Sequence, residues 1–352
     1  MVPQPTNSPD LGKSSPYDLR VVAIGGGTGL ATLLKGLKRY VLTPALAASG
    51  QTAIGELCGV VTVTDDGGSS GRLRKELNML PPGDVRNCIV ALSEDEALLS
   101  RLFQHRFKKG SGLEGHSFGN LFLAALTSIT GDFAEAVRLS SEILLTRGHI
   151  YPATTSNVEL EAVFEDGSRV RGETRITASK GKIRELFLIP PDVAPLPQTQ
   201  EAIAAADLIT IGPGSLFTSL ISNLLVPRIV EAILNSPAVK VYVCNLMTEA
   251  NESLGLTAAD HIRALNQHAR GQLFDYALIN RTPVSPEMKA SYAVEGAAQI
   301  VVDLEAIEAL GVCPVLGDYL DQGAVARHAT DRVAHDLMAL MAQAPDRHAT
   351  SR

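Results

Sequence analysis

Two short apolar runs, each ending in a glycine-rich loop that leads into a helical pattern, narrow the possible folds of this chain sharply. The first run is VVAIGGGTGL from Val21, and the second is GVVTVTDDGGSSGRLR from Gly59. Near-continuous apolar runs of this length are typical of strands covered on both faces. Strand, loop and helix in alternation indicate βαβ units and a parallel sheet.

The same alternation continues along the chain. Further short apolar runs, each predicting a buried strand, are Leu208–Ile211, Val239–Cys244, Ala277–Ile279 and Ile300–Val302. Amphipathic patterns predict helices over Gly29–Tyr40, Ser70–Met79, Glu94–Phe107, Ser117–Thr127 and Phe133–Leu145. The expected fold is therefore α/β and Rossmann-like, a three-layer α/β/α arrangement with a mostly parallel sheet.

One segment departs from this rhythm. Val158–Phe164 alternates between apolar and polar residues, Asp166-Gly167 supplies a tight turn, and Val170–Ile176 alternates again. Asp-Gly tolerates the positive φ of hairpin turns, and Lys182–Ile189 predicts a third antiparallel strand. We expect a short antiparallel insertion at about residues 154–189 within a single domain of residues 20–345. Residues 1–19, rich in Pro, Ser and Asn, predict a disordered tail and not a signal peptide.

Composition excludes several classes of protein. A net charge of −7 argues against a nucleic-acid groove that works by counterion release. The longest apolar stretch, Leu208–Val226, is interrupted by glycine and proline, so we expect no membrane span. The four cysteines are far apart and form no C-x-x-C pair, which is typical of buried thiols in a reduced, cytoplasmic protein. The histidines show no zinc-ligand spacing.

The first glycine-rich loop predicts an anion site. Gly25, Gly26, Gly27, Thr28 and Gly29 leave backbone N–H groups uncovered beside the positive end of the following helix, which suits a phosphate. The loop is neither the G-x-G-x-x-G fingerprint, whose third glycine is replaced by Leu30, nor a Walker loop.

The second loop adds carboxylates. Asp65 and Asp66 follow a strand and precede Gly68, Ser69 and the cationic Arg72. The two aspartates can hold Mg²⁺ through oxygen, or hydrogen-bond a ribose or a base. Paired carboxylates with nearby cations suit a phosphate-bearing ligand, with or without the metal.

Two predicted helix starts carry further candidates. Asp84 either caps its helix or contacts a ligand, while we expect Arg86 and Asn87 to be contacts. His116 can act as a general acid or base, or donate to a phosphate, and Asn120 follows it by one helical turn.

A third glycine loop after an apolar strand places another anion nest at the same sheet edge. It contains Gly212, Gly214 and Ser215, and Asn245 follows the next predicted strand. One ligand crevice along the carboxyl ends of the strands is expected.

Several segments in order carry a family resemblance: IGGGTGL, VTDDGGSSGRLR, PPGDVRNCIVALS, GHSFGNLFLAAL, IGPGSLFTSL and CNLMTE. The chain resembles the YvcK-type gluconeogenesis factors, a branch of the CofD-like family. CofD is a 2-phospho-lactate transferase acting on a deazaflavin. The YvcK-type branch is associated with cell shape, growth on gluconeogenic carbon sources and nucleotide-sugar binding. This chain departs from the family at Ser117, where Asn is expected, and at residues 250–253, ANES, where a Pro-Gly-Glu-Thr-like run is usual.

The resemblance implies one of two functions. The favoured one is a regulatory protein without turnover that binds a UDP-sugar such as UDP-N-acetylglucosamine, with Tyr292 stacking on the base and Arg327 pairing with the pyrophosphate. The alternative is a Mg²⁺-dependent transferase that moves a phospho-lactyl-type group from a nucleotide-activated donor. Neither implies a tightly bound organic cofactor, and both leave self-association into a homo-oligomer open.

Overall fold

The structure is a computed structural model that describes residues 18–94, 97–179, 181–321 and 323–343. The predicted disordered tail lies outside the described residues, apart from Asp18 and Leu19, which begin the first strand.

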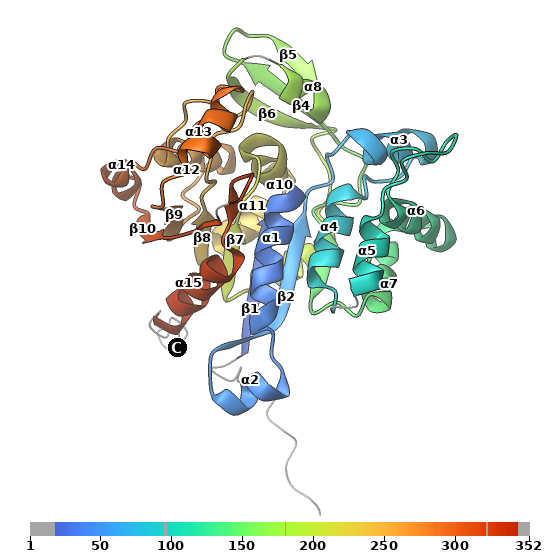
Figure 1. Ribbon diagram of the computed structural model, residues 1–352, viewed down its shortest axis with the longest axis horizontal. Helices are drawn as coiled ribbons and strands as arrows, with labels where there is room; N and C mark the ends of the chain where they lie inside the picture. Colours follow the sequence, from blue (N-terminus) through green and yellow to red (C-terminus); the bar gives the residue numbers. More distant parts are fainter. Residues whose placement is uncertain (1–17, 95–96, 180, 322, 344–352) are drawn as a thin grey trace, which may run out of the picture.

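The described residues form a seven-stranded sheet in which every neighbouring pair is parallel, in the order β10-β9-β8-β7-β1-β2-β3. Its strands are β1 (Asp18–Gly25), β2 (Ala53–Val61), β3 (His149–Pro152), β7 (Leu208–Ile211), β8 (Val239–Val243), β9 (Tyr276–Asn280) and β10 (Cys313–Gly317). Helices flank both faces, so the predicted three-layer α/β/α fold is confirmed (Figure 1).

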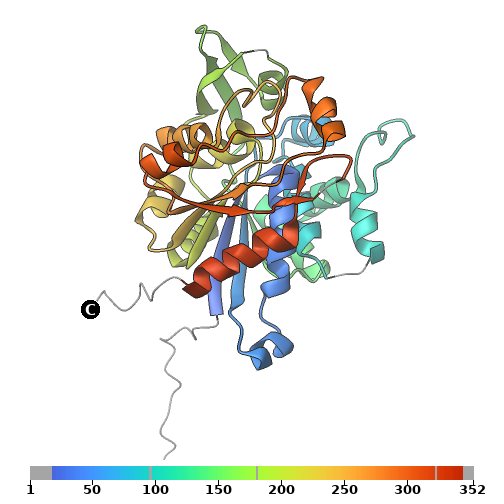
Figure 2. The same cartoon turned by 60° about the vertical axis from the view of Figure 1, so that its left-hand side comes forward.

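In Figure 1, α1, α4 and α15 lie in front of the sheet, and Figure 2 shows α15 crossing that face obliquely. The N-terminal half carries α1 (Gly27–Leu37), η1 (Lys38–Tyr40), α2 (Pro44–Ser49), α3 (Gly68–Leu77), α4 (Gly83–Leu92), α5 (Ala97–Gln104), α6 (Phe118–Thr130), α7 (Phe133–Ile143) and α8 (Glu173–Ala178). The C-terminal half carries α9 (Pro197–Ala205), η2 (Leu216–Ile221), α10 (Ser222–Leu224), α11 (Ile229–Asn235), α12 (Ala258–Ala269), α13 (Pro286–Ala293), α14 (Leu304–Ala309) and α15 (Thr330–Gln343).

The core forms where the sheet meets α1. Val21–Ile24 of β1 are at most 1% exposed. Leu30, Leu33, Leu34 and Leu37 recur at helical spacing and bury one face of α1 against the sheet. Burying each leucine contributes about 1.5–3 kcal/mol, and this packing holds the loop between β1 and α1 in place.

The strand order creates a crevice between β1 and β7. From β1 the chain builds the sheet outward through β2 to β3, and from β7 it builds in the other direction through β8, β9 and β10. Because crossover connections between parallel strands are right-handed, the connections after β1 and β7 leave toward opposite faces. Ligands of open α/β sheets bind at such a switch point.

The antiparallel insertion is present, with one change from the prediction. Strands β4 (Glu159–Phe164), β5 (Arg169–Arg171) and β6 (Ile183–Ile189) form a small sheet in the order β5-β4-β6, seen at the top of Figure 1. The predicted strand Val170–Ile176 is wrong beyond Arg171, because Gly172 adopts a φ of 96° and turns the chain into α8.

Two other expectations were wrong. Ile300–Val302 is not a strand; the Ile300 N–H donates instead to the Leu246 carbonyl (3.1 Å), and β10 covers the edge of β9. After the third glycine loop the chain enters a helix whose first turns, in η2, are π-helical. Cys313 is exposed on the edge strand, whereas the other three cysteines are buried. The short β3 and the hairpin β11 (Leu320–Asp321) with β12 (Arg327–His328) were not predicted.

Among the described residues, no single helix has the length and apolar character to cross a membrane. Residues 216–224 and 229–235 meet that test only when taken together, and they are bent by 78° relative to one another.

Candidate functional site

The loop after β1 offers backbone donors at the start of α1. The helix begins at Gly27, whose φ is 60°. Its N-cap residue, Gly26, has no side chain to cap it, and the Asp84 carboxylate accepts from the Gly27 N–H. A Cβ on Gly29 would lie 2.3 Å from the Pro213 carbonyl oxygen, so a glycine is required where the first and third loops meet. The N–H groups of Thr28 and Gly29, which follow Gly27 in the first turn, and the helix dipole make this turn an anion cradle.

A cavity of about 330 Å³ opens beside this turn. It is bounded by the loops after β1, β7 and β8, by α13 and by the residues around β12. Its lining is Gly26, Gly27, Thr28, Gly29, Pro213, Gly214, Ser215, Ser219, Asn245, Leu246, Met247, Thr248, Glu249, Tyr292, Ala326 and His328. The structure thus brings together most of the predicted residues of the first and third loops with Asn245 and Tyr292.

Gly25 and Gly212 do not line the cavity but shape the loops that do. The Gly25 carbonyl accepts a hydrogen bond from Asn223 Nδ2 (3.0 Å), which ties the first loop to the helix after β7. Gly212 has a φ of 89°, and a Cβ there would lie 2.6 Å from the Val243 carbonyl oxygen.

The anion nest predicted in the third loop is filled by the protein itself. The Gly214 N–H donates to Asn245 Oδ1 (3.1 Å). The Phe217 N–H (3.1 Å) and the Thr218 hydroxyl (2.7 Å) donate to the Glu252 carboxylate. Burial raises the pKa of Glu252 to about 7. The third loop therefore forms a wall of the cavity, while the first loop keeps its open donors.

Three further polar side chains line the cavity: Glu249, Tyr292 and His328. Glu249 accepts from the Ser215 hydroxyl, and burial raises its pKa. The Tyr292 hydroxyl accepts from the Ala326 N–H (3.2 Å). His328 Nε2 lies 3.0 Å from the Cys244 carbonyl oxygen, and burial lowers its pKa to about 4, so the ring is neutral near pH 7.

Arg327 is not brought to this cavity. Its side chain is exposed, whereas the residues on either side of it, Ala326 and His328, contribute to the lining. Side chains alternate along a strand, so β12 directs Arg327 away from the face that its neighbours present.

On the other side of the first loop lies a group of four carboxyl side chains. Asp65 Oδ1 accepts from the Gly67 N–H (2.9 Å), and Asp66 Oδ1 accepts from the Thr174 N–H (2.8 Å). Glu173 accepts from the Asp66 N–H (3.4 Å), and Asp84 accepts from the Gly27 N–H. Burial, reinforced by the charge of Asp65, raises the pKa of Asp84 to about 6 and that of Glu173 to about 8.

These contacts exclude one of the two roles considered for Asp84, the capping of its own helix. No side chain caps α4. Instead, the Asp84 carboxylate reaches back to the first loop, where Oδ2 lies 3.0 Å from the position that a Cβ on Gly26 would take.

The sequence predicted a magnesium site at Asp65 and Asp66, and the structure supports this role for Asp65 but not for Asp66. In the described part of the chain, no three His, Cys, Asp or Glu side chains surround a common cation position. Mg²⁺ usually takes one or two carboxylates, with phosphate and water completing its shell. The Asp66 carboxylate already accepts a hydrogen bond from Thr174 of the antiparallel insertion. Asp65 and Asp84, next to the first loop, are therefore the pair suited to hold Mg²⁺.

The other predicted contacts form a buried polar network behind the second loop. Ser69 Oγ lies 2.9 Å from His116 Nδ1 and accepts from Asn120 Nδ2 (3.1 Å). The Arg86 guanidinium donates to Asn120 Oδ1 (3.0 Å) and Asn87 Oδ1 (2.6 Å). Burial lowers the pKa of both His116 and Arg86. These groups fix the loop that carries Asp65 and do not line the cavity.

Gly68 and Arg72 also serve the second loop. Gly68 begins α3 with a φ of 46°. Arg72 donates to the Glu114 carbonyl oxygen (2.6 Å), so it anchors the loop that precedes His116.

Several residues at the site were not predicted, among them Glu173 and Ser219. Glu173 lies in a segment that alternates like a strand, and it meets Asp66 across 107 residues of sequence. No local pattern signals such a contact. Glu249 was recognisable only as a residue following a predicted strand.

Several known proteins are similar to this chain in sequence over most of its length. The family described as 2-phospho-L-lactate transferase CofD matches residues 21–320. A protein of Halalkalibacterium halodurans named "Gluconeogenesis factor" is 48% identical over 320 residues, which are 90% of this chain and 95% of that protein. A "Gluconeogenesis factor" of Bacillus subtilis is 46% identical over 324 residues, which are 92% of this chain and 98% of that protein. A crystal structure of a Bacillus halodurans protein superposes with a TM-score of 0.86 at 47% identity, covering 91% of this chain and 99% of that one.

Proposed function

Since this chain belongs to the CofD family, among the relatives named gluconeogenesis factors, we propose that it is a regulatory protein whose ligand is a nucleotide-sugar such as UDP-N-acetylglucosamine. It would couple carbon flow during gluconeogenic growth to cell shape. The observation that carries the proposal is the cavity of about 330 Å³ that joins the anion cradle of α1 to a recess lined by Tyr292 and Glu249. A cavity of this size with few convergent polar groups is typical of small-molecule sites.

The cradle suits a diphosphate that is neutralised without basic side chains. The described lining of the cavity contains no Lys or Arg. Backbone N–H groups at the start of α1 would hold the phosphate oxygens. Mg²⁺ at Asp65 and Asp84 would balance the remaining charge, as carboxylates and phosphates do in other Mg²⁺ sites.

The hydrogen-bond partners of the two histidines nearest the site, His116 and His328, favour binding without turnover. A general base must reach the proton that it abstracts. His116 is buried with Nδ1 directed to Ser69, and His328 uses Nε2 on the Cys244 carbonyl. Neither ring is paired with a nucleophile that faces the cavity.

The alternative is a Mg²⁺-dependent transferase acting on a nucleotide-activated donor of a phospho-lactyl-type group. The carboxylates Asp65 and Asp84 beside the first loop favour it, since phosphoryl-type transfer needs positioning and charge neutralisation more than a nucleophilic side chain.

One experiment separates the two. The protein is titrated with UDP-N-acetylglucosamine by calorimetry, with and without Mg²⁺, and the ligand is then recovered and analysed by mass spectrometry. We expect saturable binding and intact ligand. Absence of binding would overturn the proposal, and Mg²⁺-dependent consumption of a nucleotide-activated donor would replace it with the transferase.

A further inference from the structure

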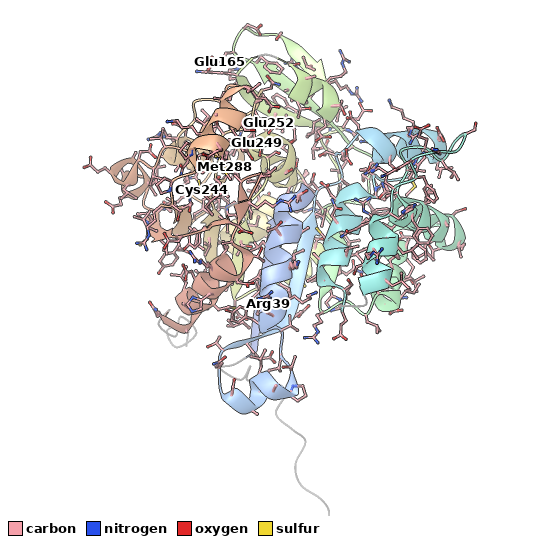
Figure 3. All side chains as sticks on the ribbon, viewed as in Figure 1. Arg39, Glu165, Cys244, Glu249, Glu252 and Met288 are labelled. Carbon is pink, nitrogen blue, oxygen red and sulfur yellow. The ribbon has the colours of Figure 1, made fainter. Side chains whose placement is uncertain are left out.

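Glu249 is the one carboxylate in the described lining of the cavity, and its partners leave it with spare capacity to accept hydrogen bonds. It accepts from the Ser215 hydroxyl, whereas an ionised carboxylate has about four lone-pair sites. In Figure 3, Glu249 lies between Glu252 and Met288. Glu252, by contrast, accepts from two backbone N–H groups and the Thr218 hydroxyl.

Most other polar groups in this part of the cavity are already committed to protein partners. Both ends of the Asn245 amide bond the Gly214 backbone (3.1 and 2.8 Å). The Thr248 hydroxyl accepts from the Ala298 N–H (2.9 Å) and donates to the Ala298 carbonyl oxygen (3.2 Å). A ligand that enters the recess therefore meets Glu249 as its main free acceptor.

The surroundings of Glu249 suit a flat, weakly polar group. Leu246 and Met247 line the cavity and belong to a small apolar cluster with Met288 and Leu320, against which Tyr292 packs. Aromatic and apolar surfaces of this kind stack on a nucleobase, whereas a hexose needs a hydrogen-bond partner for each of several hydroxyls. Phosphates held by the turn at the start of α1, which lines the same cavity, would leave the nucleoside to extend into this recess.

We propose that Glu249 accepts the imide N3–H of a uracil base and thereby selects uridine over cytidine nucleotides. This inference rests on the proposed nucleotide-sugar function and assigns the residue that recognises its base. Uracil presents a donor at N3, but cytosine presents a lone pair at the same position, which would face the carboxylate without a hydrogen between them. A site built to accept a hydrogen bond discriminates strongly against a ligand that lacks the donor.

The test compares UDP with CDP, and UDP with its N3-methyl analogue, by calorimetry on the full-length protein. In the wild-type protein we expect UDP to bind at least about tenfold more tightly than CDP or N3-methyl-UDP, the usual effect of one charge-assisted hydrogen bond. In Glu249→Gln the amide can donate or accept, so the UDP preference over CDP should fall to about threefold or less.

The matched control is Glu252→Gln, which changes a neighbouring buried carboxylate that does not line the cavity. It is expected to lower thermal stability while keeping the UDP preference over CDP. UDP binding with no preference over CDP, or an unchanged preference in Glu249→Gln, would overturn the inference while leaving nucleotide binding intact. Failure of all three nucleotides and the UDP-sugar to bind would instead contradict the proposed function. The N3-methyl comparison needs only wild-type protein, so it decides the point even where a variant folds poorly.

Discussion

Replacing Glu173 by glutamine is expected to stabilise the folded protein at alkaline pH while changing little near pH 5. Glu173 begins α8 of the insertion and lies among Asp65, Asp66 and Asp84. Burial and the neighbouring charges raise its pKa from the ordinary 4.5 to about 8. Ionising this carboxyl group therefore costs more in the folded protein than in the unfolded chain.

The sign of the effect follows from proton binding. Below about pH 4.5 the group is protonated in both states, so it adds no pH dependence. Between about pH 4.5 and pH 8 the unfolded chain releases its proton while the folded protein retains it. The folded state consequently loses stability as the pH rises through this window, and the loss is complete above about pH 8.

The magnitude is a few kcal/mol. At ~1.36 kcal/mol for each pKa unit, the difference between 4.5 and about 8 corresponds to at most roughly 5 kcal/mol. Glu173 is only half-buried, so solvent screening reduces this, and we expect about 2 kcal/mol. Glutamine keeps the oxygen that accepts from the Asp66 N–H and cannot ionise, so the variant should avoid the loss.

The assay is urea denaturation of wild type and Glu173→Gln at about pH 5 and about pH 9, with the free energy of unfolding obtained by linear extrapolation. Glu165→Gln, an exposed carboxylate of the same insertion, is the matched control and should follow the wild type at both values. The reasoning is refuted if the two unfolding free energies of Glu173→Gln differ between the pH values by as much as those of the wild type.

Two further predictions concern the loops. Gly29→Ala is expected to lower the free energy of unfolding by about 2 kcal/mol and UDP-sugar affinity at least about tenfold, because its Cβ would lie 2.3 Å from the Pro213 carbonyl oxygen. Thermal denaturation and calorimetry measure both, and Gly323→Ala, whose Cβ meets nothing nearer than 3.8 Å, is the control; wild-type behaviour of Gly29→Ala would show that the loops need not touch. Asp65→Asn should remove most of the Mg²⁺-dependent gain in nucleotide affinity, while Asp66→Asn should mainly lower stability by about 1–2 kcal/mol, since Asp66 accepts from Thr174. Equal losses of Mg²⁺ response in both variants, measured by calorimetric titration with and without the metal, would contradict this division of roles.

The sequence alone determined the local elements of this protein. Apolar runs such as Val21–Ile24 and Leu208–Ile211 were predicted as buried strands, and both are strands in the seven-stranded sheet. Their glycine loops were placed at strand ends, because glycine spacing and apolar periodicity record local backbone conformation and burial. Where a local pattern fitted two structures, as in Val170–Ile176, the prediction failed and a helix formed beyond Gly172.

Tertiary structure decided which of these elements meet and which polar groups remain open. The third glycine loop looked like an anion nest, but Glu252, 34 residues after Thr218, occupies its donors. Asp66 looked like half of a metal site, yet Thr174 of the insertion takes its carboxylate. Arg327 looked like a phosphate partner, and the alternation of β12 turns it away from the cavity. A hydrogen-bonding group shows its chemistry in the sequence, but whether a partner has already satisfied it depends on contacts between distant segments, which only the folded chain creates.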